Sequence, residues 1–188
     1  FKERAAIVTS GQLSGMVLIH LAHANKLPFR VCTLDTLRLF PETYDFFAHV
    51  EERYEIHIER RTPDAEEIDR MLAHHGEYLF FDSKQKQEYC CQIRKVKPMQ
   101  RLLDTLDVWF SGLRRDQSDD RQHVPKVQII NHKGRPILKV NALADWPEAR
   151  LWGFIYKKGV LVNPLMEPQK YEQYYESLGC TICTTPIM

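Results

Sequence analysis

The sequence predicts an α/β fold, a mainly parallel sheet with helices on both faces. Short apolar runs that suit buried strands alternate along the chain with longer segments whose apolar residues recur at helical spacing. A chain of 188 residues is the size of one domain and buries enough surface to hold a core without disulfides. We therefore expect residues 1–188 to form a single domain.

Local sequence signals mark the ends of several expected elements. Asp64 is placed to cap one helix and Gly76 to end it, and Pro41 stands where a first-turn proline belongs. A turn at 132–135 joins the last two strands as a hairpin. The predicted strands span residues 5–10, 30–36, 56–58, 107–112, 127–130 and 137–140. The predicted helices span residues 15–26, 41–54, 64–75, 88–105, 146–158 and 170–178.

Composition excludes several classes of protein. Hydrophobic residues make up 44% of the chain and charged residues 27%, which excludes a disordered or low-complexity protein. The net charge is +1, so no overall field favours nucleic acid or a membrane surface. No apolar run is long enough to span a bilayer, and no signal-peptide pattern opens the chain. We expect a soluble, cytoplasmic protein that binds neither nucleic acid nor membranes.

Three polar segments follow predicted strands, where ligands bind in parallel α/β sheets. In the first, residues 10–15, small side chains would let backbone amides approach an anion at the start of a helix. The segment lacks the spaced glycines of a dinucleotide-binding loop, and a plain strand-to-helix turn would have the same composition. An anion site and a plain turn are equally consistent with it.

The other two segments differ in how strongly they indicate ligand binding. The second contains Asp35 and Thr36, whose side chains suit either ribose binding or ordinary capping, and capping is the commoner role. The third, residues 112–121, carries three arginines, two of them the adjacent Arg114 and Arg115. Guanidiniums bind phosphate or sulfate with paired hydrogen bonds, although acidic residues in the same loop also allow a solvated, self-neutralised loop. Its place after a buried strand favours anion binding.

Four of the five cysteines form two close pairs. Cys90 and Cys91 are adjacent, Cys180 and Cys183 are separated by two residues, and Cys32 stands in a predicted strand. An odd count in a chain of this length disfavours a disulfide framework. Four thiolates hold structural zinc or an iron–sulfur cluster, and adjacent cysteines fit poorly around one tetrahedral zinc ion. We therefore expect a metal or cluster site.

Several motifs together resemble one family, the assimilatory adenylyl-sulfate reductases, which are the iron–sulfur branch of the adenylyl-sulfate/phosphoadenylyl-sulfate reductases. The resemblance covers nearly the whole chain, and its specific part is the double cysteine followed one turn later by Arg94 and Lys95. The motifs are Cys-Cys-Gln-Ile-Arg-Lys-Val-Lys-Pro at 90–98, Gly-Leu-Arg-Arg-Asp-Gln-Ser at 112–118, Gly-Cys-Thr-Ile-Cys-Thr at 179–184, Leu-Asp-Thr at 34–36 and Phe-Pro-Glu-Thr-Tyr at 40–44.

The resemblance implies an adenine-nucleotide alpha-hydrolase-like (Rossmann-like) fold and the reduction of adenylyl sulfate to sulfite and AMP. In that family a cysteine on a C-terminal tail attacks the sulfate sulfur, and thioredoxin or a similar thiol donor releases sulfite from the S-sulfocysteine. Cys90, Cys91, Cys180 and Cys183 would hold a 4Fe–4S cluster, and Lys95 would be the catalytic residue that bridges it to the substrate sulfate. The residues expected to bind substrate are Ser10, Gly11, Gln12, Ser14, Gly15, Leu34, Asp35, Thr36, Arg114, Arg115 and Gln117.

The chain departs from the family pattern at a few positions. The family's nucleophile lies in a Glu-Cys-Gly-x-His motif that does not occur before Met188, so we expect that tail beyond residue 188. Ser14 stands where an acidic residue is common, and Thr185 where an arginine often follows the cysteine pair. These departures leave the choice between adenylyl sulfate and phosphoadenylyl sulfate open. Relatives that use the latter generally lack the cluster cysteines, so adenylyl sulfate is the expected substrate.

Two other functions remain open. An adenylating sulfur transferase of the pyrophosphate-loop type would bind ATP, but the segment from Gly11 to Ser14 lacks that loop's second glycine and its acid. The other alternative is a non-catalytic iron–sulfur or zinc protein that binds a nucleotide. A homo-oligomer is consistent with the sequence but is not specified by it.

Overall fold

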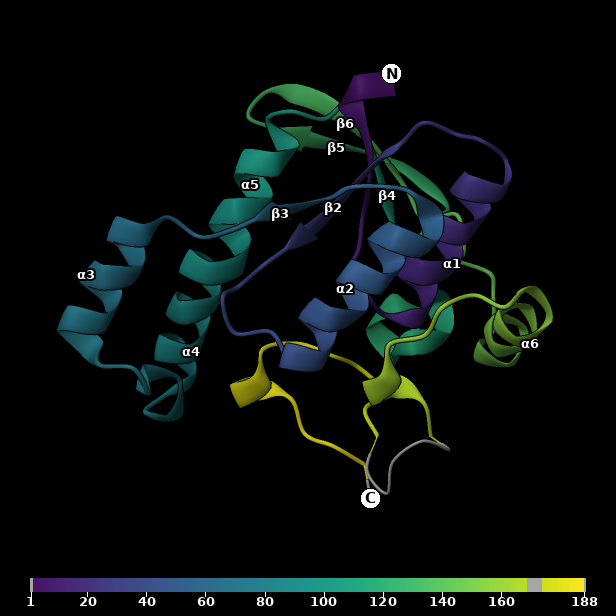
Figure 1. The fold of residues 1–188 in the computed structure, drawn as a ribbon. Coiled ribbons are helices and arrows are strands. Elements are labelled where there is room, and N and C mark those ends of the chain that lie inside the picture. Colours follow the sequence, from purple (N-terminus) through teal and green to yellow (C-terminus); the bar gives the residue numbers. More distant parts are fainter. Residues whose placement is uncertain (1, 169–173, 188) are drawn as a thin grey trace.

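The computed structural model describes residues 2–168 and 174–187 as an α/β structure built on a six-stranded sheet (Figure 1). The strand order is β3-β2-β1-β4-β6-β5, and neighbouring strands are parallel except β5 and β6, which confirms the mainly parallel sheet. The strands are β1 (Ala5–Val8), β2 (Arg30–Leu34), β3 (Ile58–Arg61), β4 (Val108–Ser111), β5 (Val127–His132) and β6 (Arg135–Val140). The α-helices are α1 (Leu13–Ala24), α2 (Pro41–Tyr54), α3 (Ala65–His75), α4 (Lys84–Cys91), α5 (Lys97–Leu103) and α6 (Glu148–Lys158).

Helices cover both faces of the sheet, as predicted (Figure 1). Successive strand residues point to opposite faces, so adjacent residues of β1 enter different cores. Ile7 packs with residues of α1, α2 and α6, whereas Ala6 packs with Leu102 and Leu103 of α5 on the other side.

A third apolar cluster lies to one side of the sheet, where α3 and α4 pack together (Figure 1). Its buried members include Met71 of α3, and Phe80 and Cys90 around α4. The first cysteine pair is therefore carried by a small lobe beside the sheet. The short helical turns are η1 (Lys2–Arg4), η2 (Leu79–Phe81), η3 (Gln92–Val96), η4 (Arg115–Gln117), η5 (Asp119–Arg121), η6 (Pro164–Met166) and η7 (Thr181–Cys183).

The third strand starts later than predicted. Residues 56–58 were expected to form it, but β3 begins at Ile58. The preceding residues complete the end of α2: Glu55 is left-handed with φ 52°, and the Ile56 N–H bonds the Glu51 carbonyl. Helix termination therefore takes up the residues whose alternation suggested a strand.

The predicted helix at 88–105 is three segments. It begins earlier, at α4, because Ser83 accepts a hydrogen bond from the Lys86 N–H as an N-cap. The helix then widens into a π turn at η3 before α5. Pro98 explains this turn, since a proline lacks an N–H and clashes with the carbonyl four residues earlier in a regular α-helix. The cysteine pair therefore ends a helix rather than beginning one.

The predicted helix at 170–178 is wrong where the structure describes it. Residues 170–173 lie outside the described residues, and 174–178 are not helical. Tyr174 instead forms an antiparallel bridge with Ile187. The other predicted strands and helices are present with ends shifted by a few residues, including the cap at Asp64 and the stop at Gly76. Within the described ranges no helix combines the length and apolar character needed to cross a bilayer.

The close approach of α1 to β1 gives a stability test. A Cβ on Gly15 would lie 2.8 Å from Thr9 Cβ, whereas a Cβ on Gly153 of α6 would meet nothing within 4 Å. Gly15→Ala should lower the free energy of unfolding by about 1–3 kcal/mol through overpacking. Gly153→Ala should raise it by about 0.5–1 kcal/mol, because alanine has the higher helix propensity. Chemical denaturation measures both, and equal effects would contradict the packing described.

Candidate functional site

The loop between β1 and α1 turns at Gly11 and leads directly into the first turn of α1. The Gly11 N–H donates to Thr9 Oγ1 at 3.0 Å, and Gly11 has φ +75°, a conformation that favours glycine. Gln12 stands at the N-cap of α1 without a side-chain hydrogen bond to the helix. The first-turn N–H groups of a helix lack helical partners and carry a partial positive charge, so this turn can receive a phosphate or sulfate.

Arg114 lies at the same helix terminus. It is 4% exposed, and its Nη1 donates to Ser14 Oγ at 3.0 Å. Its Nε donates to Asp116 Oδ1 at 2.9 Å, which holds the guanidinium in place, and Gln117 Oε1 accepts from the Arg114 N–H. The structure therefore brings together Ser14, Arg114 and Gln117, three of the residues expected to bind substrate. Gly112 makes this approach feasible, because a Cβ there would lie 2.9 Å from Ser14 Cβ.

The same loop does not gather its arginines into one receptor. Arg115 donates to the Val124 carbonyl at 2.9 Å and pairs with Asp145. Arg121 donates to Gln117 Oε1 at 2.8 Å. Their hydrogen bonds brace the loop itself, so Arg114 is the arginine of this segment that meets the α1 terminus.

The end of β2 places Asp35 and Thr36 in different roles. Asp35 is buried, and its Oδ1 accepts from the Leu37 N–H at 2.9 Å and from the Tyr44 hydroxyl at 2.8 Å. Burial, together with this hydrogen bond, raises the pKa of Tyr44 to about 12. Asp35 thus acts as a capping residue for the loop after Leu34, the commoner of its two expected roles.

Thr36 faces the second cysteine pair. Its Oγ1 accepts from Cys180 Sγ at 3.2 Å, and its carbonyl accepts from Arg94 Nη1 at 2.8 Å. The Thr181 N–H also donates to the Arg38 carbonyl at 2.9 Å. The C-terminal segment is therefore fastened to the loop after β2, and Figure 1 shows it crossing beneath α2 to reach α4.

Gln12 fastens that segment to the first loop as well. Its Nε2 donates to the Leu178 carbonyl at 2.8 Å and to Ser10 Oγ at 2.9 Å. Leu178 is two residues before Cys180. One short segment thus connects the predicted anion loop with the cysteines.

All four paired cysteines line one pocket, here called the thiol pocket. Cys90 is buried, Cys180 is half-buried, and Cys91 and Cys183 are exposed, with no disulfide among them. Thr184 shapes the second pair, since its Oγ1 donates to the Cys180 carbonyl at 2.9 Å and accepts from the Gly179 N–H. The other residues that line the pocket are Thr36, Phe80, Gln87, Arg94, Lys95 and Ile182.

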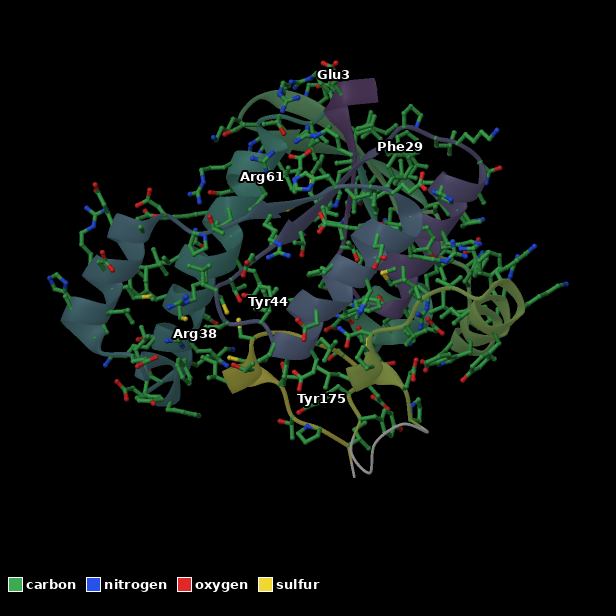
Figure 2. The ribbon with its side chains drawn as sticks, viewed as in Figure 1. Glu3, Phe29, Arg38, Tyr44, Arg61 and Tyr175 are labelled. Carbon is green, nitrogen blue, oxygen red and sulfur yellow. The ribbon has the colours of Figure 1, made fainter. Side chains whose placement is uncertain are left out.

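Arg94 and Lys95 line the thiol pocket, and Arg38 lies near Cys90 and Arg94. Arg94 is 5% exposed and its Nε has no hydrogen-bond partner among the described residues, and the same is true of Nη1 of Arg38. Burial and the neighbouring Arg38 lower the pKa of Arg94. Burial raises the pKa of Cys90 and Cys91, while Arg94 and Lys95 respectively oppose that rise. Figure 2 labels Arg38 near α4 and Tyr44 near the start of α2.

The donor set fits a thiolate centre. In the described parts of the chain, no three His, Cys, Asp or Glu side chains are drawn together as ligands of a single metal ion. The thiol pocket nevertheless offers four thiols, the set used by structural zinc and by 4Fe–4S clusters. The unpartnered Nε–H of Arg94 in its lining favours an anionic occupant, because a buried donor without an acceptor is costly.

Arg38 and Thr184 were not predicted from the sequence as residues near the cysteines. Arg38 follows the predicted strand at 30–36, and no sequence pattern indicates that it faces a cysteine pair more than 50 residues away along the chain. Thr184 does carry a signal, because it directly follows Cys183 and hydroxyl side chains commonly bond nearby backbone groups. Lys95 is exposed at the rim of the thiol pocket, as its assigned role requires.

The comparison with known families shows which family the chain belongs to. The family profile described as the phosphoadenosine phosphosulfate reductase domain matches residues 4–186. The chain belongs to this family. Within it, the chain is 35% identical to the adenosine 5'-phosphosulfate reductase of Agrobacterium fabrum, with 98% of this chain and 68% of that protein covered. It is 37% identical to the protein of the same name from Allochromatium vinosum, with 95% and 67% covered.

A solved structure of the family supports the fold. The phosphoadenylyl-sulfate reductase from Candida auris, in a phosphate complex, matches with a TM-score of 0.78 at 24% identity. The match covers 97% of this chain and 83% of that one. The expected fold class, mainly parallel and Rossmann-like, is confirmed.

Proposed function

We propose that this chain is the nucleotide-binding part of an enzyme that reduces adenylyl sulfate to sulfite and AMP in sulfate assimilation. The observation that carries the proposal is the anchoring of the second cysteine pair. Its segment is bonded to the β1–α1 loop through Gln12 and to the end of β2 through Thr36. Thiol chemistry and an anion-binding helix terminus are thereby part of one site. The relatives named adenosine 5'-phosphosulfate reductase support the choice of substrate.

In this proposal the α1 terminus and Arg114 bind the phosphosulfate. Breaking the sulfur–oxygen bond moves negative charge onto the phosphate of the departing AMP. Backbone N–H groups and a fixed guanidinium stabilise such charge best when they are already held in place. Arg114 is held by Asp116 and Ser14, so it meets that condition. Arg115 would act by bracing this loop, as its bonds to Val124 and Asp145 indicate.

The thiol pocket would hold a 4Fe–4S cluster through Cys90, Cys91, Cys180 and Cys183. When bound, the cluster would supply a fixed, polarising charge beside the substrate. Arg38 and Arg94 would offset its negative charge from the protein side. Lys95, exposed at the rim, would place its ammonium between the pocket and the sulfate.

The reaction consumes two electrons from a thiol donor. A cysteine thiolate attacks the sulfur of adenylyl sulfate, forms a sulfur–sulfur bond and expels AMP. A dithiol such as thioredoxin then attacks the resulting S-sulfocysteine, releases sulfite and becomes a disulfide. We assign the nucleophile to a cysteine outside residues 1–188. The four paired cysteines line the thiol pocket, and Cys32 is buried with a pKa raised to about 11, mainly by that burial. The proposed setting is the cytoplasm, where thiol donors are kept reduced.

The cluster assignment is tested by metal content. Full-length protein purified without oxygen should contain iron and sulfide in equal amounts, about four of each per chain. Cys183→Ser should lose most of both. Cys32→Ala, which removes the cysteine outside the thiol pocket, should retain them. Stoichiometric zinc without sulfide in the parent protein would overturn the assignment.

The role proposed for Lys95 is tested by substitution. Lys95→Ala should lower the rate of sulfite formation from adenylyl sulfate roughly 100-fold or more, because it removes a fixed cation from the reacting sulfate. Iron and sulfide content should not change. Lys84→Ala is the matched control, since Lys84 is an exposed lysine of α4 outside the pocket lining and should leave the rate unchanged. Parent-like turnover by Lys95→Ala would refute its role.

A further inference from the structure

The side chain of Gln12 is directed away from the helix that it begins. Gln12 is the N-cap residue of α1, and N-cap side chains usually accept a hydrogen bond from the first turn of their own helix. The Gln12 side chain makes no such bond to α1. Its Nε2 donates instead to Ser10 Oγ at 2.9 Å and to the Leu178 carbonyl at 2.8 Å, which uses both hydrogens of the amide group.

The backbone of Gln12 sets where the first turn of α1 begins. Its carbonyl accepts the first bond of the helix, from the Met16 N–H at 3.0 Å. The N–H groups of the next three residues have no acceptor within the helix. Gly11 comes directly before with φ +75°, and glycine has the most backbone freedom of any residue. A contact that fixes Gln12 therefore fixes the direction of the N–H groups that the proposed function assigns to the phosphosulfate.

At its other end, this contact meets a segment with a defined shape. We call residues 179–184 the cysteine turn, because they carry the second cysteine pair. The Cys180 carbonyl accepts from the Cys183 N–H and from Thr184 Oγ1, both at 2.9 Å, which closes the turn. Leu178 directly precedes the turn, and its side chain is buried in the core on the α1 and α2 face of the sheet. The position of the Leu178 carbonyl is therefore set by the core and the cysteine turn together.

The cysteine turn has anchors that do not involve Gln12. Cys180 Sγ bonds Thr36 Oγ1 at 3.2 Å, and the Thr181 N–H donates to the Arg38 carbonyl at 2.9 Å. Both contacts reach the loop after β2 rather than the loop after β1. Removal of the Gln12 amide therefore leaves the turn attached beside the thiol pocket, while it releases the loop that leads into α1. The link between the two sites can thus be broken without removing either site.

We propose that Gln12 is a positioning residue that couples the thiol pocket to the start of α1. When Cys180 and Cys183 hold the cluster, the cysteine turn is ordered, and it holds Gln12 and the first turn of α1 in the conformation that receives an anionic nucleotide. The nucleotide then spends less of its binding free energy on ordering the loop. The coupling acts in both directions, since linkage between two binding sites is reciprocal. The inference rests on the proposed function, which supplies the cluster and the nucleotide.

Calorimetry of AMP binding to the full-length protein, with and without the cluster, tests the coupling. The parent should bind AMP roughly tenfold more tightly with the cluster than without it. Gln12→Met keeps the length of the side chain but removes the donor. This variant should retain iron and sulfide, and its two forms should bind AMP with nearly equal dissociation constants. Gln100→Met is the matched control, because Gln100 is exposed on α5 outside the pocket lining and should keep the tenfold difference.

The possible results separate this inference from the proposed function. A cluster-containing parent that binds AMP equally well in both forms would overturn the inference alone. So would a Gln12→Met protein that keeps the tenfold difference of the parent. A parent that contains no iron and sulfide, or that does not bind AMP, would overturn the proposed function and the inference with it.

Hydrogen exchange in the cluster-free protein tests the reverse direction. AMP should slow amide exchange in the cysteine turn of the parent, because the reciprocal effect passes through Gln12. The amide to follow is that of Cys183, which bonds the Cys180 carbonyl. In Gln12→Met, AMP should leave the exchange of this amide unchanged. Equal slowing in the variant and the parent would mean that the nucleotide acts on the turn by another route, and would overturn the proposal.

Discussion

The guanidinium of Arg94 is buried in the lining of a pocket that also holds four thiols, and its Nε has no partner among the described residues. Burial and the neighbouring Arg38 lower the pKa of Arg94. A buried, unbalanced charge costs several kcal/mol, so it persists where an opposite charge balances it. Ionised thiols that hold a cluster would supply that balance. In the proposed function, the geometry of the site depends on this pairing of the buried Arg94 with an anionic centre.

The parallel sheet makes this arrangement possible. Since β1, β2 and β4 run in the same direction, their following loops meet at one edge, which gathers Gln12, Thr36 and Arg114. The cysteines come from outside the sheet: one pair from the lobe of α3 and α4, the other from the C-terminal segment. Hydrogen bonds from that segment to Gln12 and Thr36 join the two parts. These contacts place the β1–α1 loop and the thiols in one region of the molecule.

The sequence was a good guide to the sheet, its covering helices and the convergence of the cysteines, because hydrophobic periodicity and motif spacing report burial and ligand chemistry directly. It was a poor guide where tertiary contacts decide. Arg115 pairs with Asp145 instead of joining Arg114 at the helix terminus, and the Arg38 carbonyl accepts from the Thr181 N–H of the C-terminal segment. Both contacts are set by partners distant in sequence. The π turn has a local cause in Pro98, but hydrophobic periodicity does not report how a helix absorbs a proline.

The balance of charge in the thiol pocket is tested most directly by the variant Arg94→Met, compared with the parent in cluster-free and cluster-loaded form. Removing a buried cation that has no acidic partner among the described residues should raise the free energy of unfolding of the cluster-free protein by about 1 kcal/mol or more. The same variant should bind much less iron and sulfide than the parent. A cluster-free variant that is less stable than the cluster-free parent, or a variant that binds as much iron and sulfide as the parent, would contradict the account.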